Sequence, residues 1–321
     1  MNKKQLTLLA MIAMFIMSTG IQTLKAQTSE ETFDPHQKKS ANILGHKMAY
    51  IDIGEGRPVV FIHGNPASSY LWRNIIPYVM NDYRVIAPDL IGMGDSGKPD
   101  IDYSFQDQFD HLATLLDSLK LKNAILVIHD WGSGLGWTYA RTRPETVSAV
   151  AFMDAMVPPV HPVPSYEAFG SFGEFAQKLR TPGIGEKMAL EENIFIEEIL
   201  SREMVVTPLS EETKAEYRRP FPTPESRKPL LAWPRQIPIG GEPEDVTKII
   251  AASMQFVTDS EIPKLCLWAT PGMLMPIPVV EYLRKNMKNT DFVYIGEGIH
   301  FVQEDQPDNI GKAIANWLEQ L

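Results

Sequence analysis

Short apolar runs recur along this 321-residue sequence, and their spacing is the feature that most restricts its fold. Most of these runs contain Val or Ile, as is typical of strands buried on both faces. The runs are Met48–Ile53, Val59–Ile62, Val85–Ala87, Ala124–Ile128, Ala149–Met153, Leu265–Trp268 and Phe292–Ile295. Helix-like segments such as Phe105–Leu121 separate several of them. This α/β alternation predicts a mostly parallel central sheet with helices on both faces.

The rhythm of strands stops between residues 157 and 239. Helical stretches such as Phe172–Arg180 and Ser210–Arg219 alternate there with proline-rich breaks. We therefore expect residues 157–239 to form an inserted helical cap, and residues 41–156 and 240–321 to form the core. The last core element is an amphipathic helix within Pro307–Leu321, whose apolar residues share one face.

The N-terminal segment has the order of a secretory signal peptide. Lys3 and Lys4 precede a 16-residue uncharged run, and Lys25-Ala26 precede Gln27. Cleavage after residue 26 would give an exported protein, periplasmic or secreted, with no membrane span in its mature form. An uncleaved anchor is the alternative, although a span usually needs roughly 20 apolar residues. The polar residues 27–40 predict a flexible lead-in without a function of its own.

Charge and cysteine content restrict the partners. A formal net charge of −10 argues against a nucleic-acid partner, which needs clustered Lys and Arg, and favours small molecules. Cys266 is the only cysteine, so the chain cannot form an internal disulfide. Gly92–Gly97 matches G-x-G-x-x-G, but no second strand ends in an acidic residue about 20 residues later, as a dinucleotide site requires.

The segment from Ala124 to Gly134 carries the candidate nucleophile. A buried strand runs into a Gly-flanked turn and then a helix, which is typical of a nucleophile elbow. Asp130 occupies the position where a serine would lie, and Gly132 lets the turn close without a Cβ clash. A carboxylate attacks a saturated carbon that bears a leaving group, forming an ester, so the pattern favours alkyl halides and epoxides as substrates.

Two further segments complete the catalytic pattern. Val59–Pro66 places a strand and a tight loop before the elbow, so backbone N–H groups of Asn65 and Trp131 are candidates for binding an oxyanion. His300 follows the last predicted strand, in the order nucleophile, acid, histidine that is usual for this architecture. His129, beside the nucleophile, is expected to be structural, because adjacent side chains leave an elbow in different directions.

These motifs resemble the haloalkane dehalogenases, a family with the α/β-hydrolase fold. The resemblance runs from about Ile43 to Leu321 and rests on several stretches. They are His63-Gly64-Asn65-Pro66, His129-Asp130-Trp131-Gly132, Gly298–Asp305, Ser68–Asn74, Pro88–Pro99 and Trp233–Pro238. Together they are far more specific than the elbow alone.

The resemblance implies a two-step hydrolysis of haloalkanes to a primary alcohol, a halide ion and a proton. Asp130 displaces the halide to give an alkyl ester, and His300 then activates water to attack the ester. The Trp131 indole N–H and the Asn65 side-chain amide are expected to hold the departing halide. Neither a metal nor an organic cofactor is needed, and the partners are the halogenated hydrocarbon, water and halide.

The acid that orients His300 is predicted to be Asp154, at the end of the strand after the elbow. The subgroup that this sequence most resembles has a glutamate there, so the shorter aspartate leaves its reach to His300 open. Another subgroup supplies an aspartate after the following strand, but Ala269–Met275 contains no acid.

Three alternatives remain at this point. An epoxide hydrolase also uses an elbow Asp but needs cap tyrosines, and Tyr166 and Tyr217 lie in the insert. Asn65 argues against it, because that family usually has an aromatic residue there. A coelenterazine-type monooxygenase resembles dehalogenases in the elbow and histidine, and a ligand receptor on this fold would keep the pocket without turnover.

Overall fold

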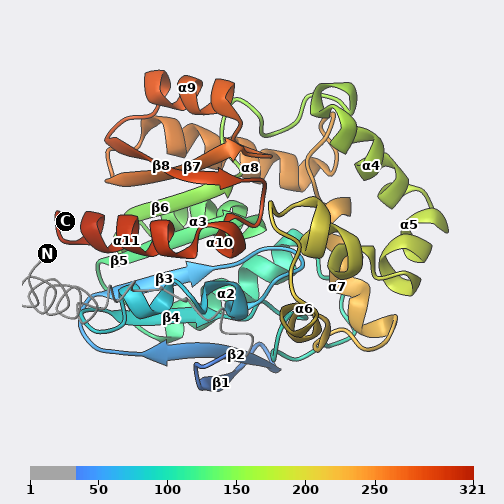
Figure 1. Ribbon diagram of the computed structural model, residues 1–321, viewed down its shortest axis with the longest axis horizontal. Helices are drawn as coiled ribbons and strands as arrows, with labels where there is room; N and C mark the ends of the chain where they lie inside the picture. Colours follow the sequence, from blue (N-terminus) through green and yellow to red (C-terminus); the bar gives the residue numbers. More distant parts are fainter. Residues whose placement is uncertain (1–33) are drawn as a thin grey trace, which may run out of the picture. The chain divides into compact units, whose positions relative to one another are not determined.

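The computed structural model describes residues 34–321, which contain one eight-stranded sheet (Figure 1). The spatial order is β1-β2-β4-β3-β5-β6-β7-β8. The strands are β1 (Lys38–Ile43), β2 (His46–Ile53), β3 (Pro58–Ile62), β4 (Arg84–Pro88), β5 (Ala124–Asp130), β6 (Val147–Ala155), β7 (Lys264–Pro271) and β8 (Thr290–Gly298). Strands β3 to β8 pair in parallel, whereas β2 runs antiparallel to β1 and β4. The seven predicted strands and the mostly parallel sheet are confirmed.

Strand β1 was not predicted. The predicted flexible lead-in, residues 27–40, ended too late in the sequence, because it included the first residues of this strand. Residues 38–40 belong to this strand, which pairs with β2 across a tight turn at Leu44 and Gly45, both with positive φ. The strand is polar because it lies at the sheet edge, and only Ile43 in it is buried. Lys38 forms ion pairs with buried Asp89 and with Asp95. The predicted signal peptide and residues 27–33 lie outside the described residues.

Helices cover both faces of the sheet. The core helices are α2 (Phe105–Ser118), α3 (Trp131–Thr142), α8 (Glu244–Asp259), α9 (Ile277–Asn286), α10 (Val302–Asp305) and α11 (Pro307–Leu318). Helix α3 packs against β5, β6 and α8, whereas α11 packs against β7 and β8. Figure 1 shows α10 and α11 in front of the sheet and α3 and α8 behind it. Strand β5 is therefore covered on both faces, and its residues 124–129 are buried.

Between β6 and β7 the described chain contributes no further strand to the sheet. The elements before α8 are η3 (Glu167–Phe169), α4 (Ser171–Arg180), α5 (Ile184–Glu186), the π-helices η4 (Lys187–Glu191) and η5 (Phe195–Glu203), α6 (Glu211–Arg218), η6 (Glu225–Arg227) and α7 (Lys228–Arg235). Helices α4 to α7 lie beyond the carboxyl ends of the parallel strands (Figure 1). Backbone hydrogen bonds from Val163 to Pro238 and from Gly240 to Val163 join the two ends of this segment.

The described residues belong to one compact unit, so the division into core and cap stays a prediction. None of the helices within residues 34–321 combines the length and the apolar character that a membrane crossing requires.

Candidate active site

Asp130 lies at the sharp turn between β5 and α3. It is the last residue of the strand and the N-cap of the helix, with φ of 48° and ψ of −131°. Two glycines make room for it. A Cβ on Gly132 would lie 2.2 Å from the Ile62 carbonyl oxygen, and one on Gly64 would lie 2.0 Å from Asp130 Oδ1. The Asp130 carboxylate lines the cavity above the turn.

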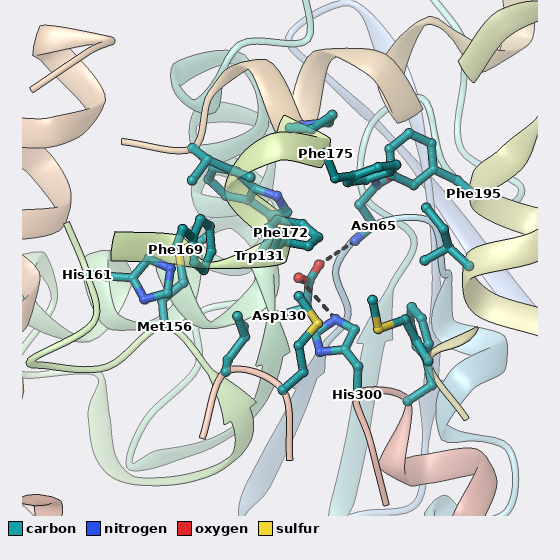
Figure 2. A pocket seen from close by; sticks show the side chains of 17 residues that line it. Asn65, Asp130, Trp131, Met156, His161, Phe169, Phe172, Phe175, Phe195 and His300 are labelled. Carbon is teal, nitrogen blue, oxygen red and sulfur yellow. Dashed lines mark hydrogen bonds and ion pairs between the residues drawn. The ribbon is translucent and has the colours of Figure 1, made fainter. Parts of the chain in front are cut away.

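The two oxygens of the Asp130 carboxylate have different surroundings. Oδ1 accepts a hydrogen bond from the Asn65 backbone N–H at 2.7 Å, and the backbone N–H of Trp131 also stabilises the charged carboxylate. Oδ2 lies 3.3 Å from His300 Nε2 (Figure 2). Burial alone would raise the pKa of Asp130, but His300 and the Trp131 N–H hold this pKa below its usual range. Asp130 is therefore ionised at neutral pH.

His300 follows β8 in a short loop before α10. Both its backbone N–H and its backbone carbonyl are held by hydrogen bonds. Its N–H donates to the Met204 carbonyl at 3.1 Å, and its carbonyl accepts from His129 Nε2 at 2.8 Å. His129 is completely buried, and burial lowers its pKa to about 3. It acts as a neutral donor that holds the His300 loop, which is the structural role expected for it.

Asp154 reaches His300 despite its short side chain. Its Oδ2 accepts from His300 Nδ1 at 2.5 Å. Asp154 is an extra residue in the β5–β6 pairing, which passes from His129↔Met153 to Asp130↔Ala155, and its φ is 33°. This bulge redirects the side chain toward His300, which explains how an aspartate spans the distance.

The second oxygen of Asp154 is held by the loop after β7. Oδ1 accepts three backbone hydrogen bonds, from the N–H groups of Met273, Leu274 and Met275, at 3.1, 3.0 and 3.1 Å. The segment Ala269–Met275, which contains no acidic residue, thus supplies the N–H donors that position Asp154 of the neighbouring strand β6.

His300 therefore lies between two carboxylates. Burial alone would lower the pKa of its imidazole, but the hydrogen bonds and charges of Asp130 and Asp154 raise this pKa above its ordinary value. In the resting protein the imidazole is a cation that both carboxylates stabilise.

Asn65 and Trp131 line the same cavity as Asp130 and His300. The Asn65 side-chain Nδ2 donates to the Leu230 carbonyl at a long 3.3 Å. The Trp131 ring packs against Phe105 and Trp233, at centroid distances of 6.2 and 4.7 Å. Within residues 34–321 its Nε1 has no hydrogen-bond partner. Both side chains can therefore donate to an anion that forms beside Asp130.

The cavity has a volume of about 60 Å³ and is largely apolar. Its other lining residues are Met156, His161, Phe169, Phe172, Phe175, Phe195, Ile199, Met204, Pro234, Ile237, Met273, Leu274 and Phe301. Phe169 of η3 and Phe172 and Phe175 of α4 all line the cavity. Figure 2 shows these rings around Asp130 and Trp131. Pro234, Ile237 and Phe301 belong to stretches that carry the family resemblance, whereas the remaining lining residues gave no recognisable sequence signal.

The two cap tyrosines that an epoxide hydrolase would need do not line the cavity. The Tyr217 hydroxyl donates to Glu304, and the Tyr166 hydroxyl accepts from Arg180 at 2.9 Å. Glu304 also forms a buried two-point ion pair with Arg73, with both N···O distances at 2.7 Å. Through these contacts Glu304 joins α10, the helix after His300, to Tyr217 of α6. In the part of the chain that the structure describes, no group of His, Cys, Asp and Glu is arranged to hold a metal ion.

Fold and site together define an α/β hydrolase that has a carboxylate at its elbow. In agreement, the family model described as alpha/beta hydrolase fold matches residues 57–307. Curated relatives narrow the assignment. A haloalkane dehalogenase from Mesorhizobium japonicum is 42% identical over 92% of this chain and 96% of its own. A haloalkane dehalogenase from Sphingobium indicum is 42% identical over 89% of this chain and 96% of its own.

Solved structures agree with these relatives. The haloalkane dehalogenase DbeA from Bradyrhizobium elkani superposes with a TM-score of 0.85 at 42% identity, covering 88% of this chain and 98% of its own. The haloalkane dehalogenase DatA from Agrobacterium tumefaciens superposes with a TM-score of 0.82 at 36% identity, covering 90% of this chain and 98% of its own. The chain belongs to the haloalkane dehalogenase family, hydrolases that act on carbon–halide bonds.

Proposed function

We propose that this enzyme hydrolyses haloalkanes through a covalent ester on Asp130. One observation carries the assignment of roles: an ionised carboxylate at the floor of an apolar cavity, with one oxygen held by backbone N–H groups and the other facing His300. In the first step Asp130 Oδ2 attacks the carbon that bears the halogen. The new C–O bond takes its electron pair from the carboxylate, and the halide leaves with the electrons of the C–X bond.

The departing halide needs donors where its charge develops. The Trp131 indole N–H and the Asn65 amide are the two donors that line the cavity beside the nucleophile. The apolar rings around them exclude water, which strengthens both interactions. These two residues are our proposed halide site.

Hydrolysis of the ester uses His300 and the N–H pair. Once Asp130 is esterified it carries no charge, so one of the two carboxylates that raise the pKa of His300 is lost. The neutral imidazole then accepts a proton from water, whose oxygen attacks the Asp130 carboxyl carbon. The oxyanion forms on Oδ1, where the N–H groups of Asn65 and Trp131 stabilise it. Collapse breaks the bond between the carboxyl carbon and the alkyl oxygen, and the alkoxide takes the proton of the new carboxyl group, which releases the primary alcohol and restores the Asp130 carboxylate. The halide from the first step and the proton that His300 loses once the ester has formed are the other products.

A single turnover in H₂¹⁸O tests this route. With enzyme in excess over 1-bromobutane, the label is expected in the Asp130 carboxylate and not in butanol, because water attacks the carboxyl carbon. Asp130→Ala is expected to release no halide, whereas Asp291→Asn, which changes an exposed carboxylate on β8, is the matched control. Label in the alcohol alone, or normal halide release by Asp130→Ala, would overturn the nucleophile assignment.

We further propose that the protein is exported after removal of residues 1–26. The basic start, the apolar run and the small residue at position 26 support this. Cell fractionation with N-terminal sequencing is expected to find a chain that begins at Gln27 in the periplasm or medium. A cytoplasmic chain that retains Met1 would contradict the proposal.

A further inference from the structure

The cavity contains one polar side chain that the proposed mechanism does not use. Asn65, Asp130, Trp131 and His300 all have a role in the two steps, and most of the other lining residues are apolar. His161 is the exception. It is only 4% exposed, yet it lines the cavity in which the substrate reacts.

His161 is held firmly. It lies in a turn after β6, where its backbone N–H donates to the Val157 carbonyl at 3.1 Å. Two residues later, Val163 is tied by backbone hydrogen bonds to the far end of the cap segment. The Phe169 ring meets the imidazole edge to face, at 6.0 Å and 90°. Figure 2 shows the His161 ring beside Phe169 and directed into the cavity.

The ring nitrogens of His161 make no hydrogen bond of ordinary length. Nδ1 is buried without one, and Nε2 makes none within residues 34–321, although the Val157 carbonyl lies close enough to raise the pKa of the ring. Burial lowers the pKa of His161 to about 4 against the opposing effect of the Asp130 charge, so the imidazole is neutral at neutral pH. A neutral imidazole presents one donor and one acceptor. Leaving them unsatisfied in an apolar cavity is unfavourable unless a bound molecule pairs with them.

We propose that His161 is a specificity-determining residue that binds the hydroxyl group of haloalcohol substrates. A hydroxyl both donates and accepts, so it pairs with either tautomer of the ring. The same hydroxyl would be poorly accommodated by the surrounding phenylalanine and methionine side chains. The proposal rests on the dehalogenase function above, and it assigns to His161 the recognition of a hydroxyl group within that function.

This contact has a consequence for α,ω-dihaloalkanes. Their first hydrolysis exchanges one halogen for a hydroxyl, giving a haloalcohol, a halide ion and a proton. The haloalcohol is itself a substrate, and a second round with another water gives the diol. A cavity that pairs the hydroxyl with His161 favours this second round, so both halogens are removed with little accumulation of the intermediate.

The test compares matched substrates in wild type and variants. kcat/KM is measured for bromoethane, 1-bromopropane and 1-bromobutane and for their ω-hydroxy analogues, and the ratio of haloalcohol to haloalkane is taken at each chain length. His161→Phe removes the polar atoms at similar bulk, and His161→Gln keeps a donor and an acceptor. Phe195→Leu alters an apolar wall of the same cavity and is the matched control.

We expect His161→Phe to lower this ratio about fivefold to tenfold at one chain length or more. His161→Gln should recover most of the loss, and Phe195→Leu should change both substrates alike. With 1,3-dibromopropane, His161→Phe should accumulate 3-bromopropanol. A ratio within twofold of wild type at every chain length in an active, folded His161→Phe would overturn the proposal. If that variant does not fold, an unperturbed His161 ring-nitrogen resonance in wild type saturated with 1-butanol would overturn it.

Wild-type enzyme that releases no halide from any of the six compounds would count against the dehalogenase function itself. Failure of the His161 proposal and failure of the dehalogenase function are therefore distinguishable, because only failure of the dehalogenase function removes activity on the unsubstituted bromoalkanes.

Discussion

Replacing Asp154 with asparagine should separate the two chemical steps. Asp154 Oδ1 accepts from three backbone N–H groups, and Oδ2 accepts from His300 Nδ1 at 2.5 Å. The amide oxygen of asparagine will keep the position among the three donors, because an NH₂ group there would face like groups. The NH₂ group then donates to His300 Nδ1, which forces the imidazole proton onto Nε2, the nitrogen that must accept a proton from water.

The size of the effect follows from this change of tautomer. The same exchange in a Ser-His-Asp triad lowers kcat by about 10⁴-fold while the geometry stays intact. We expect a loss of roughly 10³- to 10⁴-fold in ester hydrolysis here, because His300 can no longer act as the base in that step. Halide displacement should slow much less, because its nucleophile, Asp130, remains present and no proton transfer is required.

Rapid-quench measurements with 1-bromobutane provide the assay. Asp154→Asn should release about one bromide per active site in a burst and then nearly stop, and mass spectrometry should find a butyl group on Asp130. Asp154→Glu keeps the carboxylate and the tautomer, so its hydrolysis step should be far less impaired. Steady turnover within tenfold of wild type in Asp154→Asn, or slow turnover without an alkyl-enzyme, would refute this reasoning.

Three further predictions concern stability. Gly132→Ala places a Cβ 2.2 Å from the Ile62 carbonyl oxygen, so urea titration should show a loss of about 1–3 kcal/mol in unfolding free energy, and an unchanged midpoint would contradict the close approach. Glu304→Gln removes the negative charge from the buried two-point pair with Arg73 and should lower the unfolding free energy by about 3–5 kcal/mol in the same titration. A loss under 1 kcal/mol would contradict this. The folded-state pKa of His300 is raised to about 10 from an ordinary 6.5, so its stabilisation is complete below pH 6.5 and is lost as the pH rises toward 10. Thermal melts over that range should fall more steeply in wild type than in His300→Gln, and parallel curves would contradict the assignment.

The features predicted correctly from the sequence are those that depend on local chain chemistry. Buried parallel strands such as β5 are continuous apolar runs, and the elbow needs small residues at fixed offsets from Asp130, so both were recognisable. Strand β1 was missed because its stability comes from pairing at the sheet edge and from ion pairs of Lys38 with distant acids. An edge strand of this kind has no apolar pattern to recognise.

Features that depend on contacts between distant segments were beyond the sequence pattern. The reach of Asp154 depends on a bulge and a positive φ in β6, and neither follows from residue types. The pairing of Arg73 with Glu304 joins residues 231 positions apart. The place of His161 in the cavity likewise depends on how the two ends of the cap segment meet at Val163.

In the mechanism proposed above, the arrangement around His300 lets one residue serve two steps that need opposite protonation states. Before substrate reacts, two carboxylates raise the pKa of the imidazole, and the resulting cation keeps buried Asp130 ionised and therefore nucleophilic. Ester formation removes one of the two negative charges, so the pKa of His300 falls at the moment when a base is needed. Asp154, held by three N–H groups, keeps its place beside the ring and stabilises the cation that forms again when water is deprotonated. In the proposed mechanism the covalent step itself thus converts His300 from a counter-ion into a base.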